Sequence, residues 1–242
     1  MYNLLVSAGV MVVAFLLLTF AAGLSWWLSL ITSLILFMGA FYLISRIIMK
    51  KVMAIMDTAS KDLQAQRVEK GIRELQSALK YGKWQVYVTG QVNSQIGMVY
   101  YMKRDFTAAF PYLEKSFFKN WVAMGMLAIS YMKRNKKDKM KETFDKAVQG
   151  SPKEALLWNL YAYCLCEVDE PGKAKEILEK ALKKVPGDEK TSQNLELLRE
   201  GKKMKMKGFG EMWLQFHLES IGTIQKQQLA AMGGMKRRIV RR

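Results

Sequence analysis

The chain has 242 residues, half of them hydrophobic, and its 38 Lys and Arg against 21 Asp and Glu give a formal net charge of +17. Two cysteines and one histidine leave too little material for a disulfide framework, a zinc cluster or a histidine-based catalytic site. The charge is unevenly distributed, because residues 1–45 contain no charged side chain and the whole net charge lies from Arg46 onward. We therefore expect an apolar N-terminal part followed by a charged remainder.

Two uncharged apolar runs open the chain, over residues 4–22 and 28–44. Each reaches roughly 20 residues with its flanks, and a helix of that length crosses a hydrocarbon core about 30 Å thick. Gly23 and Ser25 mark a turn between the runs, next to Trp26 and Trp27, and aromatic rings prefer the membrane interface. This predicts a transmembrane helical hairpin over residues 1–48. No pattern of small residues specifies which faces of its two helices pair.

Two other interpretations of the apolar segment are weaker. A cleaved signal peptide followed by one anchor normally needs a basic residue before the first run, and none is present. A buried hydrophobic hairpin in a soluble protein does not explain two uncharged runs of this length. Arg46, Lys50 and Lys51 follow the second run, so the positive-inside rule places both termini and the large remainder in the cytoplasm. We expect an integral membrane protein, best suited to a bacterial inner membrane.

Residues 49–88 connect the hairpin to the remainder of the chain. Residues 50–66 have helical spacing and contain no Gly or Pro, so we expect the second membrane helix to continue through them as a stalk. The sequence GIRELQSAL, which begins at Gly71, carries the spacing of the second helix of a repeat. We interpret it as half a repeat that precedes the full copies.

Three stretches beyond residue 90 align with one another at spacings of 31 and 34 residues. They share a small residue and then an aromatic residue or Leu in a first helix. Small and large apolar residues follow in a second helix, and Pro152 and Pro186 close the second and third copies. The columns, in order, are Gly97, Ala128 and Ala162; Tyr100, Tyr131 and Leu165; Ala109, Met140 and Ala174; Leu113, Phe144 and Leu178; and Ser116, Ala147 and Ala181.

This pattern resembles the tetratricopeptide repeat (TPR) family, whose early tryptophan is also matched by Trp158. Met140 and Ser116 depart from the family's alanine columns, and the first copy lacks the closing proline. The resemblance implies an all-α fold in which a TPR-like α-solenoid of about three repeats, with capping helices, follows the hairpin. We assign residues 89–203 to this array with its closing helix, and residues 204–242 to an amphipathic C-terminal segment with a basic tail.

By analogy with the family, the first helices of the repeats line a concave face that binds a partner. The expected groove combines Met, Tyr and other side chains that suit an apolar peptide or helix, although several of them are equally compatible with packing against a neighbouring helix. The predicted groove residues are Ser94, Met98, Tyr101, Met102, Ile129, Met132, Lys133, Asn159, Tyr163 and Cys166. A clamp of Lys and Asn for a terminal carboxylate is not evident.

The C-terminal segment leaves more than one interpretation open. Residues 211–232 carry an imperfect apolar stripe that fits a membrane surface, the repeat array or another subunit equally well. The chain ends in Lys236, Arg237, Arg238, Arg241 and Arg242, which we predict to contact anionic lipid or an acidic partner. Nucleic acid is the weakest candidate, because no nucleic-acid fold signature accompanies the charge.

We find no sequence motif for catalysis, a metal or a cofactor. His217 has no second ligand at a suitable spacing, and Cys164 and Cys166 point to different sides of a predicted helix. We therefore expect a non-enzymatic scaffold or adaptor that binds a protein partner or assembles a complex at the membrane. The alternatives are a permanent structural subunit of a multisubunit membrane complex and a module that binds anionic lipid.

Overall fold

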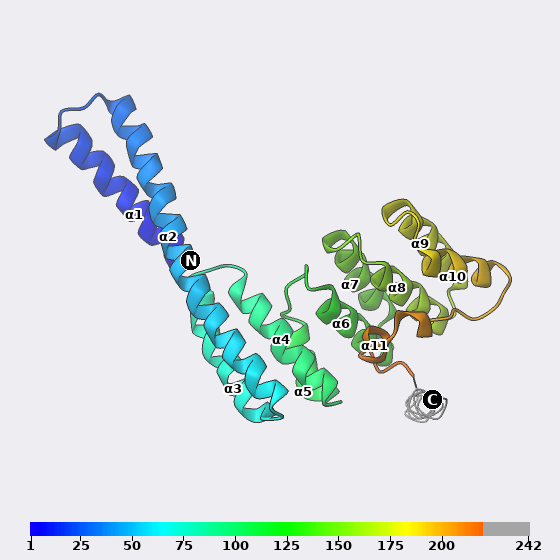
Figure 1. The fold of residues 1–242 in the computed structure, drawn as a ribbon. Coiled ribbons are helices and arrows are strands. Elements are labelled where there is room, and N and C mark those ends of the chain that lie inside the picture. The colour runs from blue at the N-terminus through cyan, green and yellow to red at the C-terminus, as the bar shows by residue number, and fades with distance from the viewer. Residues whose placement is uncertain (220–242) are drawn as a thin grey trace, which may run out of the picture. The chain divides into compact units, whose positions relative to one another are not determined.

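The computed structural model describes residues 1–219 and contains helices and connecting segments, with no β-strand in that range (Figure 1). The chain divides into two compact units, Met1–Ala123 and Met124–Arg242, which we call the N unit and the C unit. Helix α6 (Trp121–Lys133) crosses the boundary between them. The all-α class predicted from the sequence is therefore confirmed for the described residues.

The N unit begins with two apolar helices that pack side by side (Figure 1). Helix α1 spans Tyr2–Leu16 and continues through a π-helical turn at Leu17–Ala21, and α2 spans Trp26–Gln64. The chain reverses between them at Gly23, whose φ of +63° is a conformation that side-chain-bearing residues rarely adopt. Both predicted apolar runs are thus helical, and both helices are long and apolar enough to cross a membrane.

The burial pattern of this hairpin is reversed from that of a soluble helix pair. Its fully buried side chains in the apolar stretch are small and polar, and they are Asn3, Ser7, Ser29 and Ser33. Its large apolar side chains face outward, as Leu5 at 62% and Phe20 at 81% exposure illustrate. Small polar residues allow two helix backbones to approach closely, which is how helices commonly pair when their outer surface faces lipid.

Helix α2 continues well beyond the apolar hairpin and forms the first part of a helical core. Its second half packs against α3 (Val68–Ala78), where Gly71 lies so close to α2 that an added Cβ would be 2.8 Å from Leu63 Cγ. Helices α4 (Val88–Met102) and α5 (Phe106–Leu113) follow after a 3-10 turn at Leu79–Lys83. The core joins Val52 and Ala59 of α2 to residues of α3 and α4. The expected half-repeat therefore has a partner helix, supplied by α2.

The longer helices that follow α6 in the C unit are α7 (Lys137–Gly150), α8 (Ala155–Glu167), α9 (Pro171–Lys184) and α10 (Glu189–Arg199). Helix α8 packs against α7, α9 and α10. The second- and third-copy residues of the aligned columns lie in this core, where Phe144 is fully buried and stacks on Tyr161 at a ring separation of 4.8 Å. Ala147 and Ala181, at equivalent positions of α7 and α9, are also fully buried.

The same helix-ending turn occurs five times within residues 1–219. In each, one residue has a positive φ, and the next backbone N–H donates to the carbonyl five residues earlier at 2.8–3.0 Å, as in a Schellman cap. The positive-φ residues are Gln66, Arg104, Asn135, Asp169 and Gly201. The turns thus end α2, α4, α6, α8 and α10, and a second helix follows each of the first four.

Candidate partner-binding cavity

After α10 the chain does not continue directly into a second long helix but turns back along the C unit. We call residues 201–219 the return segment. It comprises an irregular stretch, a 3-10 turn at Lys207–Phe209 and the short helix α11 (Glu211–Leu214). The Lys205 backbone N–H donates to Asn194 Oδ1 at 2.7 Å, and Met206 is buried beside the same side chain. Helix α10 therefore holds the start of the return segment.

A buried polar cluster fixes α10 against α8. Asn159 Nδ2 donates to Thr191 Oγ1 at 2.7 Å, and Asn194 Nδ2 donates to Asn159 Oδ1 at 2.9 Å. Asp188 caps the start of α10 by accepting hydrogen bonds from the backbone N–H and hydroxyl of Thr191. Since every amide group of this cluster has a partner, the cluster satisfies its own polar atoms and joins α8, α10 and the return segment.

Two aromatic side chains anchor the far part of the return segment. Trp213 is 1% exposed, meets Tyr163 of α8 edge to face at 4.9 Å and donates from Nε1 to Glu219 Oε1 at 2.8 Å. Phe216 is fully buried and lies against Gly125 of α6, where an added Cβ would be 3.0 Å from Phe216 Cε1. Of the placements left open for the C-terminal segment, packing on the helical array is the one found for residues 211–219.

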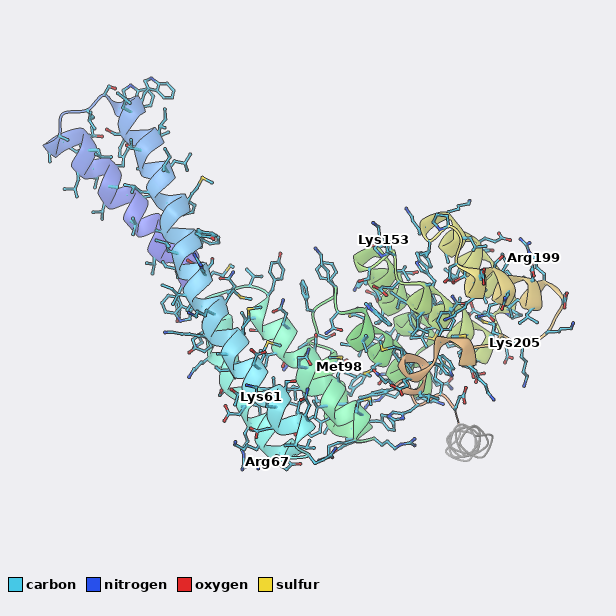
Figure 2. All side chains as sticks on the ribbon, viewed as in Figure 1. Lys61, Arg67, Met98, Lys153, Arg199 and Lys205 are labelled. Carbon is cyan, nitrogen blue, oxygen red and sulfur yellow. The ribbon has the colours of Figure 1, made fainter. Side chains whose placement is uncertain are left out.

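The return segment borders an open-sided cavity of about 950 Å³ within the C unit. Its walls come from the C-terminal end of α8, the first turns of α9, one face of α10 and the return segment itself, on which Figure 2 marks Lys205. The side chains that line it include Tyr163, Cys166, Glu167, Lys175, Lys190, Gln193, Leu198, Met204, Met206, Trp213 and Glu219. This volume lies at the upper end of the range for small-ligand pockets.

Lysines dominate the charge of this cavity. Six line it, namely Lys175, Lys190, Lys202, Lys203, Lys205 and Lys207, against the two carboxylates of Glu167 and Glu219, so the lining carries a formal charge of 6 − 2 = +4. Within residues 1–219, an ion pair within 4.0 Å is found for one of the six, Lys202 with Glu200 at 2.7 Å. Lys190 Nζ lies 5.0 Å from the centre of the Phe209 ring.

Burial changes the proton affinity of the groups on the α8 wall. Desolvation, with Glu167 nearby, raises the pKa of Tyr163 to about 12, so the phenol stays neutral and can act as a hydrogen-bond donor. Desolvation also raises the pKa of Cys166, which is half-buried in the cavity wall, and that of Cys164, which is fully buried. Both cysteines are therefore thiols at neutral pH, and this environment does not activate them as nucleophiles.

The predicted groove residues of the N unit do not form one open surface. Ser94 is fully buried, donates to the Gly90 carbonyl at 2.8 Å and accepts from the Phe117 backbone N–H at 3.0 Å. Tyr101 is 2% exposed and meets Phe106 edge to face. Met98 is half-buried and Met102 is exposed. Partner binding by these four residues remains a prediction.

In the C unit, the structure brings two predicted groove residues together in the cavity wall, Tyr163 and Cys166. Ile129 and Asn159 are buried in the helix packing, and the amide of Asn159 belongs to the polar cluster between α8 and α10. Met132 is half-buried and Lys133 is exposed, and neither lines the cavity. The predicted tail contacts Lys236, Arg237, Arg238, Arg241 and Arg242 lie outside the described residues.

Most of the cavity was not predicted from the sequence. Lys175, Lys190, Met206 and Trp213 lie on different segments, and no spacing rule links them. One signal was available in the sequence. A lysine-rich stretch after the closing helix is followed by Gly208 and Gly210 and then by Trp213 and Phe216, and this order indicates a chain that leaves a helix, turns and packs again. In comparisons with known proteins, the chain matches no family model and no curated protein sequence.

Proposed function

We propose that this chain is a non-enzymatic scaffold anchored in a membrane by its N-terminal hairpin. Its TPR-like helix pairs lie in the cytoplasm, on the inner face of a bacterial inner membrane, and bind a protein partner or assemble a membrane complex. The observation that carries the proposal is the lysine-rimmed cavity of about 950 Å³ in a chain that also begins with two lipid-length helices.

Two features support parts of this proposal. The hairpin places small polar side chains inside and large apolar ones outside, which suits lipid as the surrounding medium. The recurring helix pairs and their identical turns suit a repeat protein that offers a binding surface.

The experiment is lysine crosslinking and mass spectrometry on intact membranes, followed by sizing in mild detergent. We expect the chain to resist alkaline carbonate extraction and to form reproducible crosslinks to one protein from Lys202–Lys207. Release from vesicles by carbonate would contradict the anchor. The absence of any crosslink to another protein would contradict the scaffold function. A large assembly that never dissociates would favour a permanent structural subunit.

A further inference from the structure

We propose that the cavity of the C unit binds an acidic peptide segment of a partner protein, with a large apolar side chain of that segment against Tyr163 and Trp213. This inference rests on the proposed scaffold function and specifies the chemistry of the partner. The site is formed by α8, α9, α10 and the return segment, and it shares Tyr163 and Cys166 with the groove along the first helices that the repeat resemblance implies.

The charge of the lining selects an anion. Five of its six lysines have no carboxylate within 4.0 Å in residues 1–219, so their ammonium groups are available to a ligand. Of the two carboxylates, Glu219 accepts from Trp213 Nε1 at 2.8 Å, and Glu167 lies close enough to Tyr163 to help raise the pKa of its phenol. A concave site lined by one sign of charge concentrates its potential and attracts the opposite charge.

The apolar part of the lining distinguishes a peptide from a simple anion. Tyr163, Trp213, Met204, Met206 and Leu198 contribute apolar surface beside the lysines. Methionine side chains adapt to different shapes, and an aromatic pair offers a flat surface for a ring or a branched aliphatic group. A volume of about 950 Å³ holds several amino-acid residues. Acidic groups flanking one large apolar side chain match both features.

The chain's own C-terminus is an unsuitable occupant. Residues 220–242 contain six Lys and Arg and no Asp or Glu, so they carry the same sign of charge as the cavity rim. Repulsion between like charges disfavours their entry. The match in charge is instead with a segment from another protein.

Cys166 provides a reporter of occupancy at this site. It lines the cavity and is half-buried, whereas Cys164 is fully buried. A maleimide should therefore label Cys166 slowly and Cys164 far more slowly, because burial restricts access and raises both thiol pKa values. Labelling of the Cys166→Ala variant measures the background from Cys164.

The test uses the full chain in nanodiscs of phosphatidylcholine, which adds no net lipid charge. The probe is a synthetic peptide of about ten residues with Glu on both sides of a central Leu and Phe, and its control replaces every Glu with Gln. We expect the acidic peptide to slow Cys166 labelling at least about fivefold, and to bind about tenfold more weakly when ionic strength rises from about 0.05 to about 0.5 M. The Gln peptide should give no protection.

A matched pair of variants separates the site from general charge. Lys203→Glu/Lys205→Glu/Lys207→Glu reverses three rim charges and should weaken peptide binding more than about tenfold. Lys153→Glu/Lys180→Glu/Lys184→Glu makes the same change in net charge on exposed lysines outside the cavity lining, and should alter binding less than about twofold. Circular dichroism and an unlabelled Cys164 check that both variants are folded.

Several outcomes overturn the inference. Equal losses in the two triple variants would show binding by net charge alone. Protection of Cys166 by phosphatidylserine vesicles or by single-stranded RNA, without protection by the peptide, would assign the site to another ligand class. If crosslinks to a partner persist in the rim variant, the scaffold proposal stands and the cavity is not its binding site. If no partner is found in membranes at all, the scaffold proposal itself fails.

Discussion

The apolar hairpin and the C unit bury opposite kinds of side chain. In the hairpin, Ser7, Ser29 and Ser33 are inside and Phe20 is 81% exposed. In the C unit, Phe144 and Phe216 are fully buried, and most of the lysines lie at the surface. Apolar burial is driven by water, so a region surrounded by lipid has no such driving force between its helices. If the hairpin lies in lipid, as we propose, substitutions of one residue type should have different effects in the hairpin and in the C unit.

Replacing a phenylalanine by alanine should give the largest difference between the hairpin and the C unit. Phe144→Ala removes a fully buried ring that stacks on Tyr161, and we expect the free energy of unfolding to fall by about 3–5 kcal/mol. Phe20→Ala removes an equally large ring from the outer face of the hairpin and should change it by less than about 0.5 kcal/mol. Denaturant unfolding of both variants in the same detergent measures the difference. Equal destabilisation would mean that the hairpin has an ordinary soluble core.

Substitution of an exposed residue of α2 by lysine tests which part of this helix contacts lipid. Ile35 and Met53 are 62% and 61% exposed, but Ile35 lies within the uncharged apolar stretch and Met53 lies beyond it. Ile35→Lys should disfavour insertion by about 2.5–3.5 kcal/mol, the usual cost of Lys at the centre of a membrane helix. Met53→Lys is the matched control and should have little effect. The fraction that resists carbonate extraction measures both, and equal behaviour would contradict a membrane-spanning α2.

The polar cluster gives a smaller effect in the C unit. Asn194→Ala removes the partners of the Asn159 amide and of the Lys205 backbone N–H, and we expect a loss of about 1–3 kcal/mol. Trypsin should then cleave faster at Lys202–Lys205, because the return segment loses its attachment to α10. Gln193→Ala, at the exposed neighbouring position, is the control and should leave both stability and cleavage unchanged. Unchanged cleavage in Asn194→Ala would show that Trp213 and Phe216 alone hold the segment.

The sequence predicted those parts of the molecule that depend on local pattern. The apolar runs gave both hairpin helices, and the aligned columns placed Phe144, Ala147 and Ala181 in a core because their spacing is helical. The pairing face of the hairpin was not predictable, since Asn3 and three serines are spread over two helices without a recognised motif. The cavity was also missed, because Lys175 and Trp213 meet only after the return segment folds back, and an irregular path has no periodicity.

The recurring helix-ending turns give the smallest expected effects. They place different residue types in the same positive-φ conformation, so the cost of that conformation can be compared between the two units. Arg104 in the N unit has a φ of +63°, and Gly201 in the C unit has a φ of +73°. A residue with a Cβ is disfavoured in this conformation by roughly 1–2 kcal/mol, part of which is offset because glycine loses more freedom on folding. We expect Arg104→Gly to stabilise the protein by up to about 1 kcal/mol and Gly201→Ala to destabilise it by about 1 kcal/mol. Asn135→Gly should gain less than Arg104→Gly, since asparagine tolerates this conformation better than arginine. Thermal unfolding of the three variants checks the order, and a loss of stability in Arg104→Gly would show that the arginine side chain contributes more than its backbone strain costs.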